Sequence, residues 1–309
     1  MDVGGANAPR VEGTQGGARE AAAQWRRAHP AAFEALCAAL EPFDVAVNAA
    51  GAATPGVPAS RGLFEANAVL PAVVAQAAAG AGVRRLVHLS TASVQGRLDP
   101  LDETLLTCPL SPYAVSKTQG EAVLARTDAR RERPAEVVIY RPTAIQGADR
   151  ATTRSLGRMA ASLPVVPLAG RGDRPAPVSL LENVAAGVLF AATMPEPPPV
   201  VLQPWEGLTT RRLLEIFGAR RIVPLPERMV DLVLRAAGRA TARSAAATAA
   251  LRRVELVVAG QAVNADALAR AGFVAPCGVE RWEALARELR GGEVAPAAGP
   301  SLPAADPAA

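Results

Sequence analysis

Cysteine, histidine and lysine are all scarce in this 309-residue chain, and each scarcity argues against a class of function. The three cysteines are odd in number and widely spaced, which favours reduced thiols over a disulfide framework. Two histidines without metal-ligand spacing predict no metal site. Basic and acidic residues are mixed along the chain without a block of five like charges, so we expect no nucleic-acid partner.

Long apolar runs are also missing. The most apolar stretch, 66–83, contains Asn67, Pro71 and Gln76, and it predicts a buried helix rather than a membrane span. The first residues lack the basic and apolar regions of a signal peptide. We therefore expect a cytoplasmic protein with no membrane partner.

Half of the residues are apolar, and their arrangement predicts an α/β fold. Short apolar runs are typical of buried parallel strands, and helical periodicity separates them. The expected strands lie at 43–51, 85–91 and 136–142, and the expected helices at 21–40 (broken at Pro30), 62–79 and 112–131. This alternation predicts a doubly wound, Rossmann-like parallel sheet with helices on both faces.

Beyond residue 150 the pattern becomes mostly helical. Helices are expected at 152–162, 181–193, 208–217, 226–258 and 280–290, separated by connections rich in Pro and Gly. We divide the chain into a Rossmann-like domain at 1–150 and a smaller substrate-binding lobe at 151–290 that is interleaved with the sheet. Residues 291–309, nearly all Gly, Ala and Pro, predict a disordered tail.

The chain's only lysine, Lys117, lies four residues after Tyr113, one of its two tyrosines. All other basic residues are arginine, so a lysine retained at this place is a specific signal. Pro112 suits the first turn of a helix, and residues four apart share a helix face. The alternative is a tyrosine at an interface and a lysine on the surface of the helix, its stem against apolar neighbours.

A phenol and an ammonium group in one cleft suit proton transfer. The cation would lower the pKa of Tyr113 toward the range in which it exchanges protons at neutral pH. Thr91, at the carboxyl end of the second expected strand, supplies a hydroxyl that can hold a substrate oxygen. No side chain transfers hydride, so this chemistry needs NAD or NADP.

Several segments, in order, resemble the extended short-chain dehydrogenase/reductases, the NAD-dependent epimerase/dehydratase family, over roughly residues 40–290. Similar segments are DVAVNAAG at 44–51, Asn67 in its helix, STASVQG at 90–96, YRPTAIQG at 140–147, SLLENVA at 179–185, and the stretch from Ala267 to Trp282. By this resemblance Thr91 assists a catalytic Tyr113 and Lys117. The resemblance also implies a set of cofactor contacts: Asn48, Ala49, Ala50, Gly51, Asn67, Ser90, Lys117, Arg141 and Pro142.

The resemblance is weakest at the start of the chain. The family opens with a strand and a GxxGxxG turn that binds the cofactor's pyrophosphate. The glycines at 4–5 and 13–17 neither follow an apolar strand nor open a clear helix, and only 43 residues precede Asp44. We expect the first strand and glycine loop to be missing, and binding of NAD(P) to be weak in consequence.

The resemblance implies an enzyme, an NAD(P)-dependent epimerase or reductase acting on a nucleotide-activated sugar as its small-molecule partner. It also implies a homodimer through the helices at 62–79 and 112–131. Thr91 is followed by Ala92 and Ser93 rather than by the Asp-Glu pair of sugar 4,6-dehydratases, so we expect no dehydratase. Two alternatives remain open: an inactive family member that acts as a binding module, and a reductase of a lipid-like or steroid-like ketone.

Four arginines are further candidates, in this case for contacts with a nucleotide diphosphate. Solvated arginines are the more common outcome, because charged side chains are mostly exposed. The four are Arg171, Arg174, Arg211 and Arg212.

Overall fold

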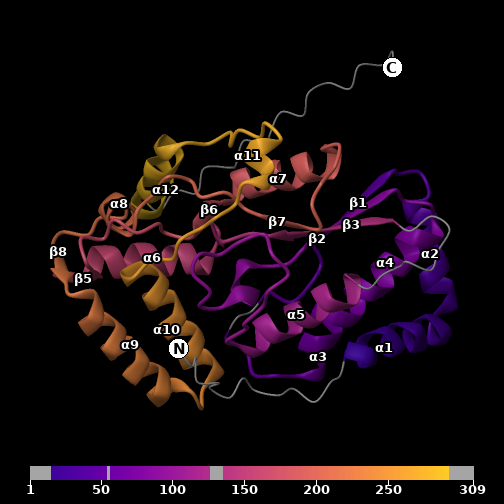
Figure 1. The fold of residues 1–309 in the computed structure, drawn as a ribbon, viewed down its shortest axis with the longest axis horizontal. Helices are drawn as coiled ribbons and strands as arrows, with labels where there is room; N and C mark the ends of the chain where they lie inside the picture. Colours follow the sequence, from indigo (N-terminus) through magenta and orange to yellow (C-terminus); the bar gives the residue numbers. More distant parts are fainter. Residues whose placement is uncertain (1–14, 54–55, 126–134, 292–309) are drawn as a thin grey trace.

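Four parallel strands form the central sheet of the computed structural model, which describes residues 15–53, 56–125 and 135–291. In spatial order they are β1 (Val45–Asn48), β2 (Arg85–Leu89), β3 (Glu136–Arg141) and β7 (Val200–Leu202). Helices lie above and below the strands (Figure 1). The predicted α/β fold with a parallel, Rossmann-like sheet is therefore confirmed.

Side chains alternate across the two faces of the sheet, and both faces are covered. Val87 and Tyr140 pack against α7 (Leu181–Thr193), whereas Leu86 packs on the opposite side against α4 (Leu70–Gly80) and α5 (Pro112–Leu124). Burial on both faces explains why these strands are continuous apolar runs rather than alternating ones.

The helix predicted at 62–79 consists of three segments that adjoin. These are α3 (Arg61–Phe64), a π-helical segment η1 (Glu65–Val69) and α4. By length and hydropathy Arg61–Gly80 could cross a membrane, but more than half of it is buried inside the protein, as in a core helix. Gly120 of α5 allows η1 to approach closely, because a Cβ at this position would lie 2.2 Å from the carbonyl oxygen of Asn67.

Two helices, α1 (Gln15–Ala28) and α2 (Pro30–Leu40), precede the sheet, and they are separated at His29 and Pro30 as predicted. In α1, Ala18 and Ala22 are fully buried against side chains of η1, α4 and α5. The helix therefore covers part of the face expected to form a homodimer, and that dimer stays a prediction. Residues 15–44 contain no strand. The expected absence of the glycine loop stays a prediction, because it also concerns residues 1–14, which lie outside the described ranges.

The lobe is less helical than predicted, because it contains two pairs of short strands. Its helices pack around Trp282, Leu213 and Leu285, which are fully buried. The strand pairs are β4 (Ala144–Gln146) with β6 (Val178–Leu180), and β5 (Val166–Ala169) with β8 (Ile222–Leu225). The helices are α6 (Ala151–Ser162), α8 (Thr210–Ile216), α9 (Glu227–Thr241), α10 (Ala245–Val258), α11 (Ala267–Arg270) and α12 (Val279–Gly291).

Strands of three or four residues carry too little periodicity to be distinguished from loops. Ser244, whose hydroxyl accepts the backbone N–H of Ala247, starts α10 and divides the helical stretch expected at 226–258. Strand β7 belongs to the central sheet although it comes 50 residues after the domain boundary proposed at 150, and that boundary stays a prediction. The expected tail lies outside the described residues from 292 onward.

Candidate active site at the strand ends

Thr91 is fixed at the carboxyl edge of the sheet. The backbone N–H of Ser90 donates to the Tyr140 carbonyl oxygen (2.7 Å), and that of Ala92 donates to the Pro142 carbonyl oxygen (2.9 Å), so the ends of β2 and β3 are tied together. The Thr91 hydroxyl accepts the backbone N–H of Ser93 at 3.2 Å and caps a short 3₁₀ turn. Its position therefore follows from backbone geometry rather than from a flexible side chain.

Helix α5 presents a polar face to these strand ends. Ser111 caps the helix by accepting the backbone N–H of Ala114 at 3.2 Å, and Pro112 occupies the first turn. Tyr113, Lys117 and Glu121 follow at four-residue intervals, and all three are buried, at 8%, 5% and 3% exposure. The Tyr113 hydroxyl is hydrogen-bonded to the Thr91 side chain.

The electrostatics of Tyr113 differ from the sequence expectation. Burial raises the pKa of the Tyr113 hydroxyl, while the hydrogen bond with Thr91 and the charge of Arg150 oppose that shift. The Lys117 ammonium instead donates to the Leu89 carbonyl oxygen at 2.9 Å. This carbonyl lies at the end of β2 and holds the ammonium there.

Lys117 lies in a polar environment beneath the loop after β1. Burial lowers the pKa of Lys117 to about 8, and the Glu121 carboxylate opposes the shift. Burial, and then the charge of Lys117, lowers the pKa of His88 to about 3, so that imidazole is neutral. Its Nδ1 atom lies 3.2 Å from the Asn48 amide nitrogen.

A buried ion pair joins α5 to β3 next to these residues. The Arg141 guanidinium, fully buried, donates twice to the Glu121 carboxylate (2.6 and 3.0 Å) and once to the Thr104 carbonyl oxygen (2.7 Å). The Ser90 hydroxyl also donates to Glu121. Two of the residues expected to contact a cofactor, Ser90 and Arg141, thus direct their polar groups at Glu121.

The other expected cofactor contacts divide into two groups. Asn67 is fully buried: its amide oxygen accepts the Ala52 N–H (2.9 Å), and its amide nitrogen donates to the Ala52 carbonyl and to the Ser116 hydroxyl (both 3.0 Å). Asn48 is buried and accepts the Ala50 N–H at 3.1 Å. Pro142 is buried as well. The exposed members are Ala49, Ala50 and Gly51 at the end of β1.

Because Gly51 has no side chain, the loop backbone lies directly above the Lys117 ammonium. A Cβ at this position would lie 2.8 Å from the Asn67 amide oxygen and 3.2 Å from the Lys117 ammonium nitrogen, so a larger residue would have to displace one of them. An open backbone with a buried ammonium beneath it suits a ligand that carries hydroxyl groups, such as the ribose of a dinucleotide.

Arg150, which immediately precedes α6, is a site residue that the sequence reasoning missed. Its charge acts on the Tyr113 hydroxyl, and its Nε atom is buried without a hydrogen-bond partner within the described part of the chain. A half-buried guanidinium with free donor capacity, whose charge acts on the Tyr113 hydroxyl, suits an anionic or oxygen-rich ligand. No sequence pattern distinguishes it from the many other arginines.

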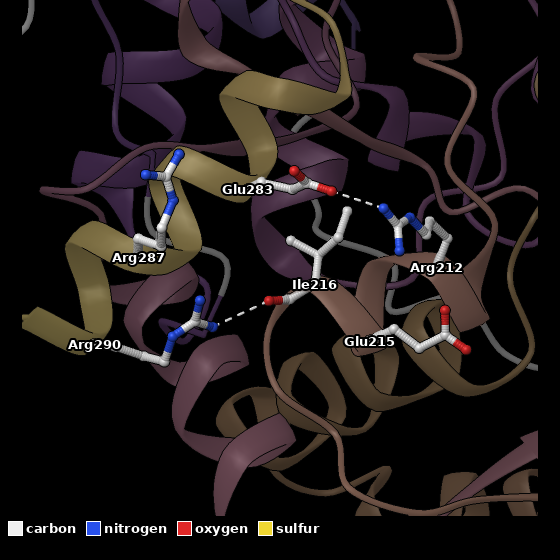
Figure 2. Close-up of a pocket in the computed structure, with 6 residues that line it drawn as sticks. All are labelled: Arg212, Glu215, Ile216, Glu283, Arg287 and Arg290. Carbon is white, nitrogen blue, oxygen red and sulfur yellow. Dashed lines mark hydrogen bonds and ion pairs between the residues drawn. The ribbon is translucent and has the colours of Figure 1, made fainter.

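A depression of about 310 Å³ lies between α8 and α12 in the lobe (Figure 2). It is lined mostly by charged side chains, and an ion pair between Arg212 and Glu283 (2.7 Å) crosses it. It includes neither Thr91 nor Tyr113. The other arginines proposed for a diphosphate also form ion pairs: Arg171 with Asp173 (3.9 Å), Arg174 with Asp99, and Arg211 with Glu215 (3.9 Å).

Metal ligands do not gather anywhere in the described ranges, which hold no group of three His, Cys, Asp or Glu placed to bind a metal. The expectation that the protein needs no metal stays a prediction.

Three solved structures illustrate the likeness to known folds. A UDP-glucose 4-epimerase of Thermotoga maritima, solved with UDP-glucose, is 16% identical, with 84% of this chain and 82% of that chain covered and a TM-score of 0.56. A UDP-glucuronic acid 4-epimerase of Bacillus cereus, in complex with UDP-glucuronic acid and NAD, is 17% identical (84% and 79% covered, TM-score 0.55). A dTDP-glucose 4,6-dehydratase of Streptomyces venezuelae with NAD bound is 20% identical (84% and 78% covered, TM-score 0.54). These likenesses show the fold.

Family membership rests on the sequence itself. A search of curated proteins finds no match. Residues 11–200, more than half of the chain, match the model of the NAD dependent epimerase/dehydratase family. The chain therefore belongs to this family of oxidoreductase-type enzymes, as its sequence motifs predicted.

Proposed function

We propose that the protein is an NAD(P)-dependent epimerase or reductase that acts on a nucleotide-activated sugar through Thr91, Tyr113 and Lys117. One observation carries the proposal: the Tyr113 hydroxyl is hydrogen-bonded to Thr91 at the strand ends, with the only lysine buried one helical turn later. Family membership supports the cofactor class, and the nucleotide sugars bound by the proteins of similar fold support the substrate class.

The chain's own groups supply the proton chemistry. Because its pKa is raised, Tyr113 is a neutral phenol at neutral pH and is suited to donate its proton to an oxygen that gains negative charge. Thr91 holds that oxygen. NAD(P)H, when bound, supplies the hydride to the carbonyl carbon. With hydride delivered to that carbon, the proton from Tyr113 would complete the alcohol, and solvent would then reprotonate the tyrosine.

Lys117 and Arg150 have separate roles in this proposal. The lysine holds the hydroxyl-bearing part of the cofactor against the exposed loop at Ala49, Ala50 and Gly51. The arginine, whose charge already acts on Tyr113, binds an oxygen-rich part of the substrate and favours the phenolate in the reverse, oxidising direction.

One specific observation favours the inactive binding module as a second candidate. The Lys117 ammonium donates to the Leu89 carbonyl oxygen, and burial raises the pKa of the Tyr113 hydroxyl, so the resting phenol is not activated in the way that the sequence predicted. A binding module would bind a nucleotide sugar without converting it.

Replacing Tyr113 by Phe tests the proposal, and Tyr140→Phe, the only other tyrosine, is the matched control. UDP-glucose or UDP-glucuronic acid is incubated with the full chain and with either NAD⁺ or NADH, and the products are separated by chromatography. We expect Tyr113→Phe to reduce kcat by roughly 10²–10⁴-fold without weakening NAD⁺ binding measured by calorimetry. Tyr140→Phe should retain most of the activity, because this residue packs in the core against α7.

Two outcomes would overturn the assignment. Turnover by Tyr113→Phe close to that of the unmodified protein would exclude the phenol as the proton donor. Binding of a nucleotide sugar without any turnover by the unmodified chain would favour the binding module.

A further inference from the structure

Helix α9 exposes a stripe of apolar side chains to solvent. Leu232 is 66% exposed, Val233 60% and Met229 44%. Ala236 and Ala240 are exposed as well, which completes the spacing i, i+3, i+4, i+7 and i+11 along one side of the helix. Five exposed apolar positions in register form one face rather than scattered surface residues.

The other face of α9 attaches the helix to the lobe, and the exposed stripe packs against nothing in the described chain. Val230 and Leu234 are buried against β5, β8 and α10, and they hold the helix in the lobe. In Figure 1, α9 runs along the outer edge of the lobe, with α10 on its inner side. The stripe is therefore not needed to attach the helix to the protein.

Cations border the stripe. Arg228, Arg235 and Arg239 are exposed and lie four, three and seven residues from Leu232, respectively, and Arg243 follows in the turn. Asp231 pairs with Arg235 at 3.6 Å. Within the described ranges, Arg228, Arg239 and Arg243 have no ion-pair partner. The edge of the stripe thus carries uncompensated positive charge.

We propose that α9 lies on an anionic membrane surface, with Met229, Leu232 and Val233 at the headgroup–acyl boundary and the arginines against phosphate headgroups. A helix with one apolar face and a cationic border has the features of interfacial helices. Charge decides between occupants: a second copy would bring the same uncompensated arginines, whereas anionic lipid brings the opposite charge. Such a helix binds at the membrane surface without spanning it, so the lack of a membrane span in the sequence did not indicate this partner.

Vesicle flotation of the full chain tests the proposal. We expect the protein to float with vesicles of phosphatidylcholine and phosphatidylglycerol and to remain below with phosphatidylcholine alone. Leu232→Glu with Val233→Glu should lower the partition coefficient at least a hundredfold. Val274→Glu with Val279→Glu, at exposed positions outside α9, should leave it nearly unchanged.

A charge-matched pair separates specific docking from general attraction. Arg228→Gln with Arg239→Gln should lower the partition coefficient about thirtyfold at low salt, since each arginine near an anionic surface contributes roughly 1 kcal/mol. Arg220→Gln with Arg221→Gln removes the same charge from exposed positions outside α9 and should have a much smaller effect.

Three results would overturn the proposal. In the first, the unmodified protein stays in the bulk solution when anionic vesicles float. In the second, both members of a variant pair lose binding equally. In the third, sedimentation shows a dimer that Leu232→Glu with Val233→Glu dissociates while no vesicle binding occurs, which would assign the stripe to a second copy. Circular dichroism confirms that each variant is folded, as expected for substitutions at exposed positions.

Discussion

The polar face of α5 and the apolar face of α9 are opposites in both chemistry and burial. On α5, Tyr113, Lys117 and Glu121 are buried and each has a partner, so their positions are determined from within the protein. On α9 the apolar side chains are exposed, and among the described residues three of the four bordering arginines (Arg228, Arg239 and Arg243) have no ion-pair partner. Burying a polar group costs desolvation free energy, which hydrogen bonds and ion pairs within the protein must offset. An exposed apolar face, in contrast, stabilises a complex only when a partner removes it from water.

The largest effect that tests this contrast should come from Glu121. Replacing it by Ala leaves the Arg141 guanidinium buried without its carboxylate, and we expect a loss of about 3–5 kcal/mol in the free energy of unfolding. Glu65→Ala is the control, because its ion pair with Arg61 is exposed at the surface. That change should cost roughly 0–1 kcal/mol in urea unfolding. Equal losses in the two variants would show that burial of the pair at α5 is unimportant.

The fold was largely predictable from the sequence. The three runs ending near Asn48, Leu89 and Arg141 are continuous apolar runs, a pattern typical of parallel strands that are covered on both faces. The break before Pro30 and the start of α5 at Pro112 follow from local backbone chemistry. Strand β7 was missed because its three residues are too few to show a period.

The sequence predicted which candidate residues lie close together but not their electrostatics. The four-residue spacing brings Tyr113 and Lys117 onto one helix face, but it says nothing about the Leu89 carbonyl that takes the ammonium. The cofactor contacts expected of Arg141 and Ser90 stay predictions, and their side-chain bonds to Glu121 could not be foreseen, because a motif gives a residue's place in the chain and not the direction of its side chain. The ion pair between Glu121 and Arg141 joins residues 20 positions apart on different elements, and no local pattern encodes it.

A smaller effect, of opposite sign, is expected at Lys117. Burial lowers its pKa from an ordinary 10.5 to about 8, so the charged lysine disfavours the folded state at neutral pH. Lys117→Met removes this cost as well as the hydrogen bond to Leu89, and we expect a net gain of roughly 1–2 kcal/mol in stability. Turnover and cofactor binding should fall in the same variant, because the ammonium donor is gone.

The dependence on pH gives this prediction its own check. Between about 8 and 10.5 the unfolded chain still binds the proton that the folded chain has released, so stability of the unmodified protein should rise with pH across that interval. The Met variant lacks this rise, and the two stabilities should converge. A variant less stable than the unmodified protein at neutral pH would mean that the lysine's hydrogen bond outweighs its desolvation.

The smallest effect should come from the stripe itself. Leu232→Ala on α9 removes a side chain that is 66% exposed, so we expect the free energy of unfolding to change by no more than about 0.5 kcal/mol. Leu234→Ala, two residues later, removes a side chain that is 9% exposed and should cost about 2–4 kcal/mol. Urea unfolding of both variants without lipid measures the difference. If Leu232→Ala were as costly as Leu234→Ala, the stripe would already be packed within the protein, and its exposure could not be explained by an external partner.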